Sequence, residues 1–167
     1  RKGLISLLGQ ISNSKQVDDG PIRNHFPAAQ QAKFSNTVIR ALGYDFERGR
    51  SDPTAHPFMT RFAHGDVRIT TRTNKLFLGE HLFVTIHEAG HALYEQGTRA
   101  DDDGTPLGGG ASSGMHESQS RLWENIVARS PEFWSYWYPQ LQAAFPEQLR
   151  NVKLDEFYNA INRVEPS

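Results

Sequence analysis

Apolar residues recur every three or four positions near both ends of the chain, which is the spacing of one face of a helix. This pattern predicts a first helix through Leu4, Leu7, Leu8 and Ile11, and a last helix through Leu154, Phe157, Tyr158 and Ile161. A further helix is predicted between Pro27 and Leu42, because proline suits a first helical turn and Gly43 favours helix termination.

Another helix is predicted at a clear start signal. Ser130 can cap this helix and Pro131 suits its first turn, so we expect it to run to about Ala144. Its aromatic residues at helical spacing are Phe133, Trp134, Trp137 and Tyr138. They could form a platform for carbohydrate, but large rings at this spacing more often fill a core, and we predict a core role.

The stretch after Asn74 predicts a central helix that is buried on most sides. Its apolar residues fall on more than one helical face, and they are Leu76, Phe77, Leu82, Phe83, Val84, Ile86, Ala89 and Leu93. Asn74 is predicted to cap the start, and Gly97 is predicted to end the helix in the left-handed conformation. After a glycine-rich loop, a second helix is predicted from Ser113 to about Arg129.

Strand signals are fewer and lie before the central helix. Apolar and polar residues alternate from Tyr44 to Arg48 and from Asp66 to Thr70. Alternation places Asp66, Arg68 and Thr70 on one face of the second segment, where the acid and the base can pair. The whole pattern predicts a mainly α fold with a small β-sheet of two or three strands before the central helix.

Composition agrees with one globular domain over residues 1–167, since 37% of the residues are hydrophobic and 22% are charged. A net charge of −1 without a basic cluster argues against nucleic acid as a partner. No apolar run is long enough to span a membrane. The absence of cysteine excludes disulfides and thiolate metal ligands, and it fits a cytoplasmic protein.

The most informative segment is His87-Glu88-Ala89-Gly90-His91. In a helix, His87 and His91 share one face with roughly 6 Å between them, so both imidazoles can bind one ion while Glu88 holds a water. Imidazoles and a carboxylate without partners are costly in an apolar interior, and a shared cation would offset that cost. The alternative is two core histidines with ordinary hydrogen-bond partners, beside a glutamate on the helix surface.

Two segments could supply a third ligand. Asp101 to Asp103 are carboxylates, but an acidic run beside glycines is more often a solvated loop. Glu117 lies in the helix predicted after that loop and therefore has a firmer backbone. Two histidines and one carboxylate leave the fourth tetrahedral position open, which is the pattern of catalytic zinc. Cobalt and manganese are alternative ions for such a site.

Four motifs in a fixed order resemble those of the carboxypeptidase Taq family of zinc metallocarboxypeptidases. They are His56-Pro57-Phe58, Asp66-Val67-Arg68-Ile69-Thr70, His87-Glu88-Ala89-Gly90-His91 and His116-Glu117-Ser118-Gln119. The likeness continues to Asn125 and covers at least residues 45–125. It implies a helical, zincin-like fold in which the two helix histidines and Glu117 bind zinc and Glu88 is the catalytic base.

The resemblance also places the first two motifs at a cleft for a peptide substrate. His56, Asp66 and Arg68 are therefore candidates for substrate binding. Tyr94, like His56 and Arg68, is a candidate to stabilise a developing oxyanion.

Metal-binding histidines usually donate their second ring nitrogen to a carboxylate or a carbonyl. Glu124 is a candidate for this role, because it lies two helical turns after Glu117 on the same face. His116 is a second candidate for a role beside the ligands. The alternative for Glu124 is an ordinary surface glutamate.

Two further motifs of the family, I-R-x-x-A-D and G-x-x-Q-D-x-H-W, do not occur in these residues. By the resemblance, these two motifs are expected beyond Ser167, and the arginine that binds the substrate carboxylate is expected in the same segment. The chain is therefore interpreted as the central piece of a larger enzyme or as a shortened relative. We favour a metallocarboxypeptidase. A zinc endopeptidase, a zinc aminopeptidase and a truncated, non-catalytic zinc-stabilised module are the alternatives, and the family implies a homodimer.

Overall fold

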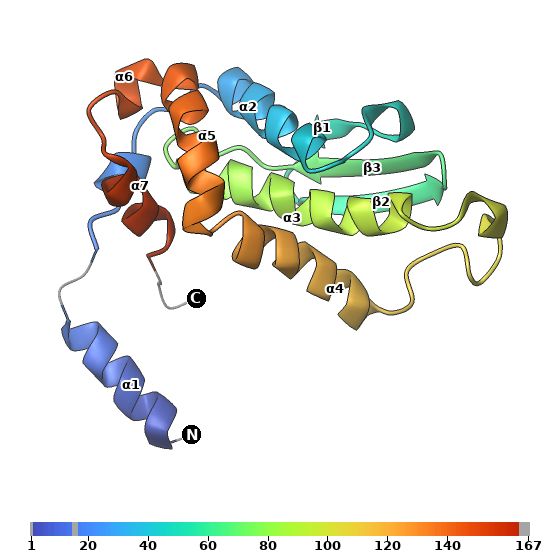
Figure 1. The fold of residues 1–167 in the computed structure, drawn as a ribbon, viewed down its shortest axis with the longest axis horizontal. Coiled ribbons are helices and arrows are strands. Elements are labelled where there is room, and N and C mark those ends of the chain that lie inside the picture. The colour runs from blue at the N-terminus through green and yellow to red at the C-terminus, as the bar shows by residue number, and fades with distance from the viewer. Residues whose placement is uncertain (1, 15–16, 164–167) are drawn as a thin grey trace.

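The computed structural model describes residues 2–14 and 17–163, and it is mainly helical (Figure 1). The helices are α1 (Lys2–Asn13), α2 (Ala28–Ala41), α3 (Leu78–Gln96), α4 (Ser113–Arg121), α5 (Pro131–Ala144), α6 (Pro146–Leu149) and α7 (Leu154–Ile161). The strands are β1 (Ser51–Pro53), β2 (Phe58–Ala63) and β3 (Asp66–Thr71). The predicted fold class, helices with a small sheet before the central helix, is confirmed.

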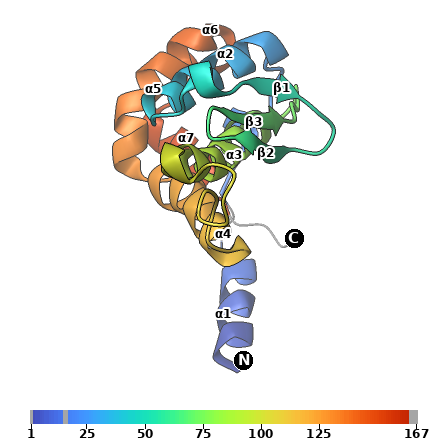
Figure 2. The same cartoon turned by 90° about the vertical axis from the view of Figure 1, so that its right-hand side faces the viewer.

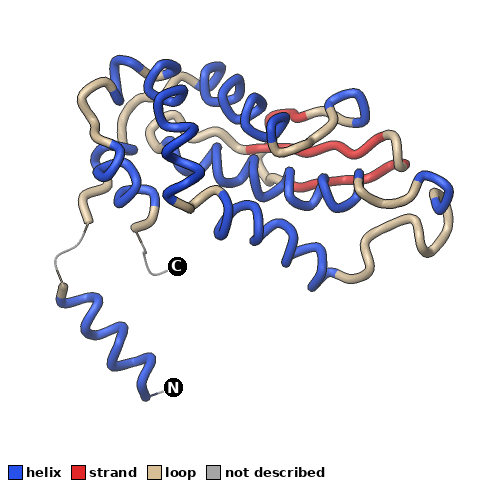
Figure 3. Tube along the Cα trace, in the orientation of Figure 1, coloured by secondary structure: helices blue, strands red, loops and turns tan. Residues whose placement is uncertain are grey.

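The three strands form one sheet in the order β1-β3-β2, in which β3 is parallel to β1 and antiparallel to β2. Figure 3 shows the strands running alongside α3. Val67 and Ile69 of β3 are fully buried in the core on the side of α3. The alternation predicted for this strand is confirmed, because Asp66 and Arg68 pair with each other on the exposed face.

Helix α3 forms the centre of the fold and contacts the sheet, α2 and α4. Its buried apolar residues point in several directions and include Leu82, Phe83, Ile86, Ala89 and Ala92. The prediction of a helix buried on most sides is confirmed.

Both predicted ends of α3 are wrong in detail. The helix begins after Phe77, which gives no side-chain cap, while Asn74 accepts from the backbone N–H of Leu76 and donates to Glu80. Asn74 therefore stabilises the turn before the helix. Gly97 does end the helix, but its φ of −83° lies in the right-handed region. The left-handed conformation that glycine permits is therefore not adopted there.

The segment 44–48 is not a strand. Tyr44 is buried and its hydroxyl donates to the carbonyl of Val67, while Phe46–Arg48 forms one turn of 3₁₀ helix. A short alternation forms a strand only when a ladder partner is available, and β1 takes that place beside β3 instead. Neither β1 nor β2 was predicted as a strand.

The helix predicted from Ser113 to about Arg129 begins where expected, but it does not stay α-helical to its predicted end. Ser112 caps α4 by accepting from the backbone N–H of Met115. The α-helix ends at Arg121 and continues as a π-helical turn over Leu122–Val127. This wider turn carries Glu124, and insertions of this type are frequent at functional sites.

The remaining predicted helices are confirmed. Ser130 caps α5 by accepting from Phe133, and the four aromatic residues predicted for the core are buried. Gly43 follows α2 with a φ of +110°. Helix α1 stands away from the other helices in both views, and its apolar residues are exposed (Figures 1 and 2). Among the described residues, no helix is long and apolar enough to cross a membrane.

His81 gives the fold a pH-dependent component. Its ring is buried and its Nδ1 lies 3.2 Å from the carbonyl oxygen of Arg72. Burial holds the pKa of His81 below its usual value of 6.5, because the charged ring is poorly solvated. The unfolded chain therefore binds this proton more readily than the folded chain.

We therefore expect the free energy of unfolding to fall as the pH drops from 6.5 through the lower folded-state pKa of His81. One proton contributes a slope of at most about 1.4 kcal/mol per pH unit. Denaturant titrations between pH 8 and pH 5 should show a weaker dependence in His81→Gln than in the parent. His25→Gln, at an exposed histidine, is the control, and equal slopes in all three proteins would contradict the expectation.

Candidate metal centre

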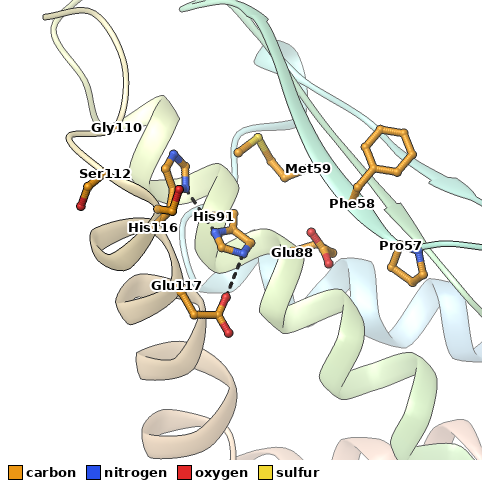
Figure 4. A pocket seen from close by; sticks show the side chains of 10 residues that line it. Pro57, Phe58, Met59, Glu88, His91, Gly110, Ser112, His116 and Glu117 are labelled. Carbon is orange, nitrogen blue, oxygen red and sulfur yellow. Dashed lines mark hydrogen bonds and ion pairs between the residues drawn. The ribbon is translucent and has the colours of Figure 1, made fainter.

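Three side chains from two helices converge on one point. Glu117 Oε2 of α4 lies 3.5 Å from Nε2 of His87 and 3.5 Å from Nε2 of His91, both on α3. Figure 4 shows Glu117 facing His91. One ligand atom from each residue lies within 4.8 Å of the others. Two ligands at about 2.0 Å from a tetrahedral zinc ion lie roughly 3.3 Å apart, so the spacing and the donor set fit a divalent metal.

Gly90 is the reason that α4 can bring Glu117 to the histidines. A Cβ at this position would lie 2.7 Å from Cα of Ser120 and 3.0 Å from the carbonyl oxygen of Gln119. Such contacts are closer than real side chains tolerate, so the backbones of the two helices meet at a position that only glycine allows. The glycine between the two histidines is therefore part of the site, which the sequence alone did not indicate.

His87 is held by a carboxylate on its second nitrogen. Its Nδ1 lies 2.8 Å from Glu124 Oε2, and this hydrogen bond raises the pKa of His87 despite burial. The contact that we expected from Glu124 is present. Arg121 contacts both carboxylates, with Nε 2.8 Å from Glu117 Oε1 and an Nη atom 3.2 Å from Glu124 Oε2.

The surroundings of Glu117 favour its charged form. Burial acts to raise the pKa of Glu117, but hydrogen bonds from Arg121 and Ser120 outweigh it and the pKa lies below its usual range. The ionised carboxylate is the form that binds a metal. His91 shows the opposite balance, because burial lowers the pKa of its ring and so favours the neutral imidazole that metals require.

Glu88 lies beside the ligands in a cleft of about 790 Å³. The cleft is lined by Pro57, Phe58, Met59, Glu88, His91, Gly110, Ser112, Ser113, His116 and Glu117. Glu88 is only 8% exposed, and burial raises the pKa of its carboxyl, with the charges of Glu117 and Glu124 adding to the shift. A carboxylate with a raised pKa in a cleft suits proton transfer.

The predicted substrate residues are not brought to this cleft. His56 is exposed and does not line it, although its neighbours Pro57 and Phe58 do. Asp66 and Arg68 face away from α3 because Val67 and Ile69 take the buried face of the same strand. The Tyr94 hydroxyl accepts from the backbone N–H of Ala111, 3.1 Å away, outside the cleft lining.

The acidic loop stays apart from the candidate metal ligands, as expected. Asp103 pairs with Arg61 of β2, and residues 101–103 do not belong to the cluster of possible ligands. Two residues near the site were missed by sequence reasoning. Glu95 is a buried carboxylate that contacts His116, and Arg61 forms an ion pair with Glu95. The spacing of His87, His91 and Glu95, four residues each, was the available signal.

Gly110 offers a test of how tightly His116 is held. A Cβ at Gly110 would lie 2.4 Å from the His116 ring, whereas one at Gly109 would meet nothing closer than 3.7 Å. We expect Gly110→Ala to displace His116 and to lower the affinity for a divalent metal by about 10–100-fold, the range for lost outer-shell partners. Competition with a chelator measures this affinity. Gly109→Ala is the matched control, and equal affinities in the two variants would contradict the expected role of Gly110.

Comparisons with known proteins agree on one family. A family model described as carboxypeptidase Taq (M32) metallopeptidase matches residues 1–167. The chain is 46% identical to thermostable carboxypeptidase 1 of Thermus thermophilus and 42% identical to carboxypeptidase 1 of Bacillus subtilis. Both alignments cover 100% of this chain, and they cover 33% and 34% of those proteins. The chain therefore spans about a third of the length of the curated relatives it matches.

A solved structure gives the same picture. The crystal structure of an M32 carboxypeptidase from Deinococcus radiodurans superposes with a TM-score of 0.94 at 49% identity. The superposition covers 98% of this chain and 33% of that chain. The sequence and the fold are thus similar to one continuous part of longer proteins.

Proposed function

Because the chain belongs to the carboxypeptidase Taq (M32) family of metallopeptidases, we propose that it carries the metal centre and the general base of a zinc-dependent metallocarboxypeptidase. The observation that carries this proposal is the convergence of His87, His91 and Glu117, at a cleft that His91 and Glu117 line together with Glu88. The family implies a divalent metal and a peptide substrate. Zinc is our specific proposal, with cobalt or manganese as possible substitutes.

The ligands that would hold the ion are Nε2 of His87, Nε2 of His91 and the carboxylate of Glu117. When bound, the ion would polarise the scissile carbonyl and increase the acidity of water in the cleft. Glu124 and Arg121 hold His87 and Glu117 in place through their hydrogen bonds. These contacts support the proposal, because they would hold two of the three candidate ligands in place before an ion binds.

Glu88 is proposed to move the proton. Its carboxylate would accept a proton from the attacking water and then deliver it to the departing amine. Its raised pKa favours this double role, because a base that is too weak would not accept the proton and a base that is too strong would not return it.

Recognition of a free C-terminus requires a fixed cation, and a bidentate arginine suits a carboxylate best. Among the described residues, those that line the cleft include neither arginine nor lysine. Arg68 is engaged by Asp66 on the exposed face of the sheet. We therefore propose that the anchoring cation lies outside the described residues that line the cleft.

A panel of short peptides tests the function. We expect the full-length protein to cleave an N-blocked dipeptide with a free C-terminus, and to lose this activity when the C-terminus is amidated or the metal is chelated. Cleavage that requires a free N-terminus would indicate an aminopeptidase, and internal cleavage of a doubly blocked peptide would indicate an endopeptidase. Metal binding without cleavage of any substrate would support a non-catalytic zinc-stabilised module. The homodimer and the cytoplasmic location stay predictions.

A further inference from the structure

A chain of polar contacts leads from His91 to a buried carboxylate. His91 Nδ1 lies 3.2 Å from His116 Nδ1, and His116 Nε2 lies 2.6 Å from Glu95 Oε1. Figure 4 shows His116 beside His91, on the side away from Glu117. The other nitrogen of His91, Nε2, is the one that faces Glu117. His91 therefore has one nitrogen toward the metal ligands and one toward His116.

Glu95 faces a backbone donor and a cation. Its Oε1 accepts from the backbone N–H of Gly110 at 3.0 Å, and its Oε2 lies 3.4 Å from Nε of Arg61. The Glu95 side chain is 7% exposed. The Gly110 N–H donates to Oε1, and the Arg61 guanidinium lies near Oε2 as an ion-pair partner without a hydrogen bond. These neighbours favour an acceptor role of the Glu95 carboxylate toward His116. Arg61 of β2 pairs in turn with Asp103 of the acidic loop. The series of contacts that starts at His91 therefore ends at β2 and this loop.

These contacts couple the proton positions of the two neutral rings. A neutral imidazole has one N–H donor and one acceptor nitrogen. If Nε2 of His116 donates to Glu95, then Nδ1 of His116 can only accept, and Nδ1 of His91 must donate to it. The proton of His91 then lies on Nδ1, and the lone pair on Nε2 points toward Glu117.

We propose that Glu95 and His116 are positioning residues that fix the tautomer of His91, so that its Nε2 is always available to a metal. This inference rests on the proposed metal centre. Both candidate ligand histidines would then have their Nδ1 proton oriented by a carboxylate. His87 donates to Glu124 directly, and His91 is linked to Glu95 through His116. It also assigns Arg61 and the Gly110 N–H the task of orienting Glu95.

The tautomers can be observed without any metal. In metal-free protein labelled with ¹⁵N-histidine, long-range proton–nitrogen correlation spectra at about pH 8 distinguish the protonated ring nitrogen in neutral imidazoles. We expect the proton on Nδ1 of His91 and on Nε2 of His116. Glu95→Gln should mix the two forms of both rings, because an amide can donate as well as accept. Glu80→Gln, which removes an acid on the same helix, should leave the spectra unchanged.

Zinc affinity provides the second readout. His116→Phe keeps the ring volume but removes the acceptor for His91, and we expect zinc affinity to fall by about 10–100-fold. His116→Asn should restore part of this loss, because its amide oxygen can take the place of Nδ1. Affinity is measured by chelator competition, with circular dichroism to verify the fold of each variant.

The outcomes separate this inference from the proposed function. A parent protein with the His91 proton on Nε2, or with equal populations of both tautomers, would overturn the inference even if zinc binds tightly. Equal zinc affinities in His116→Phe and His116→Asn would also overturn it. A protein that shows the expected tautomers but binds no zinc would instead overturn the proposed metal centre.

Discussion

Replacing Glu88 by glutamine is expected to lower turnover by about 10²–10⁴-fold, the range that general acid-base catalysis contributes. The amide has the same shape as the carboxyl group but cannot accept the proton of the attacking water. Metal content should stay at the level of the parent, because Glu88 is not one of the three residues whose ligand atoms converge. The measurement is kcat on a blocked dipeptide, together with metal per chain by mass spectrometry.

A matched control exists on the same helix. Glu80 is a carboxylate of α3 that pairs with Arg72 and does not line the cleft. Glu80→Gln makes the same chemical change and should leave kcat close to that of the parent. If Glu88→Gln retained full turnover, or lost its metal together with its activity, the assignment of Glu88 as the base would be wrong.

Replacing Glu117 by alanine should cause the largest loss of metal affinity. Outer-shell partners of a metal contribute about 10–100-fold, and a direct ligand should contribute more than that. The substitution also leaves Arg121 without one of its two carboxylate partners and leaves His87 and His91 to bind the ion alone. Dissociation constants from competition with a chelator measure the effect.

The control for this substitution is Glu47→Ala, at an exposed glutamate outside the cleft. Its zinc affinity should match that of the parent. Unchanged zinc content in Glu117→Ala would contradict the assignment of Glu117 as a ligand. It would make Glu124, which contacts His87, the next candidate carboxylate.

Much of the fold followed from local patterns. The spacing of apolar residues located α1 and α7, and proline, glycine and capping signals located α2 and α5. The alternation around Val67 and Ile69 located β3 with its correct buried face. The four motifs also pointed to the family that the comparisons show. These features could be predicted because each depends on residues within one or two turns of a helix or along one strand.

Other features depended on partners far away in the sequence. Tyr44 to Arg48 alternate as a strand would, yet the place beside β3 is taken by β1. Asn74 has the chemistry of a helix cap, but its side chain instead bonds Leu76 and Glu80. In each case the conformation that the local sequence prefers is overridden by packing around α3. A pattern within one segment does not contain the residues that cause this packing.

For the site, the sequence by itself determined the types of ligand and the spacing of His87 and His91, because helical geometry places residues four apart on one face. It also indicated Glu117 and Glu124 as the carboxylates. Only the tertiary structure decided how these groups meet. Gly90 lets α4 approach α3 closely enough for Glu117 to reach both histidines. The contacts from His91 through His116 to Glu95 likewise arise because helices and a loop distant in sequence are packed together, and close backbone approach is a property of the folded chain alone.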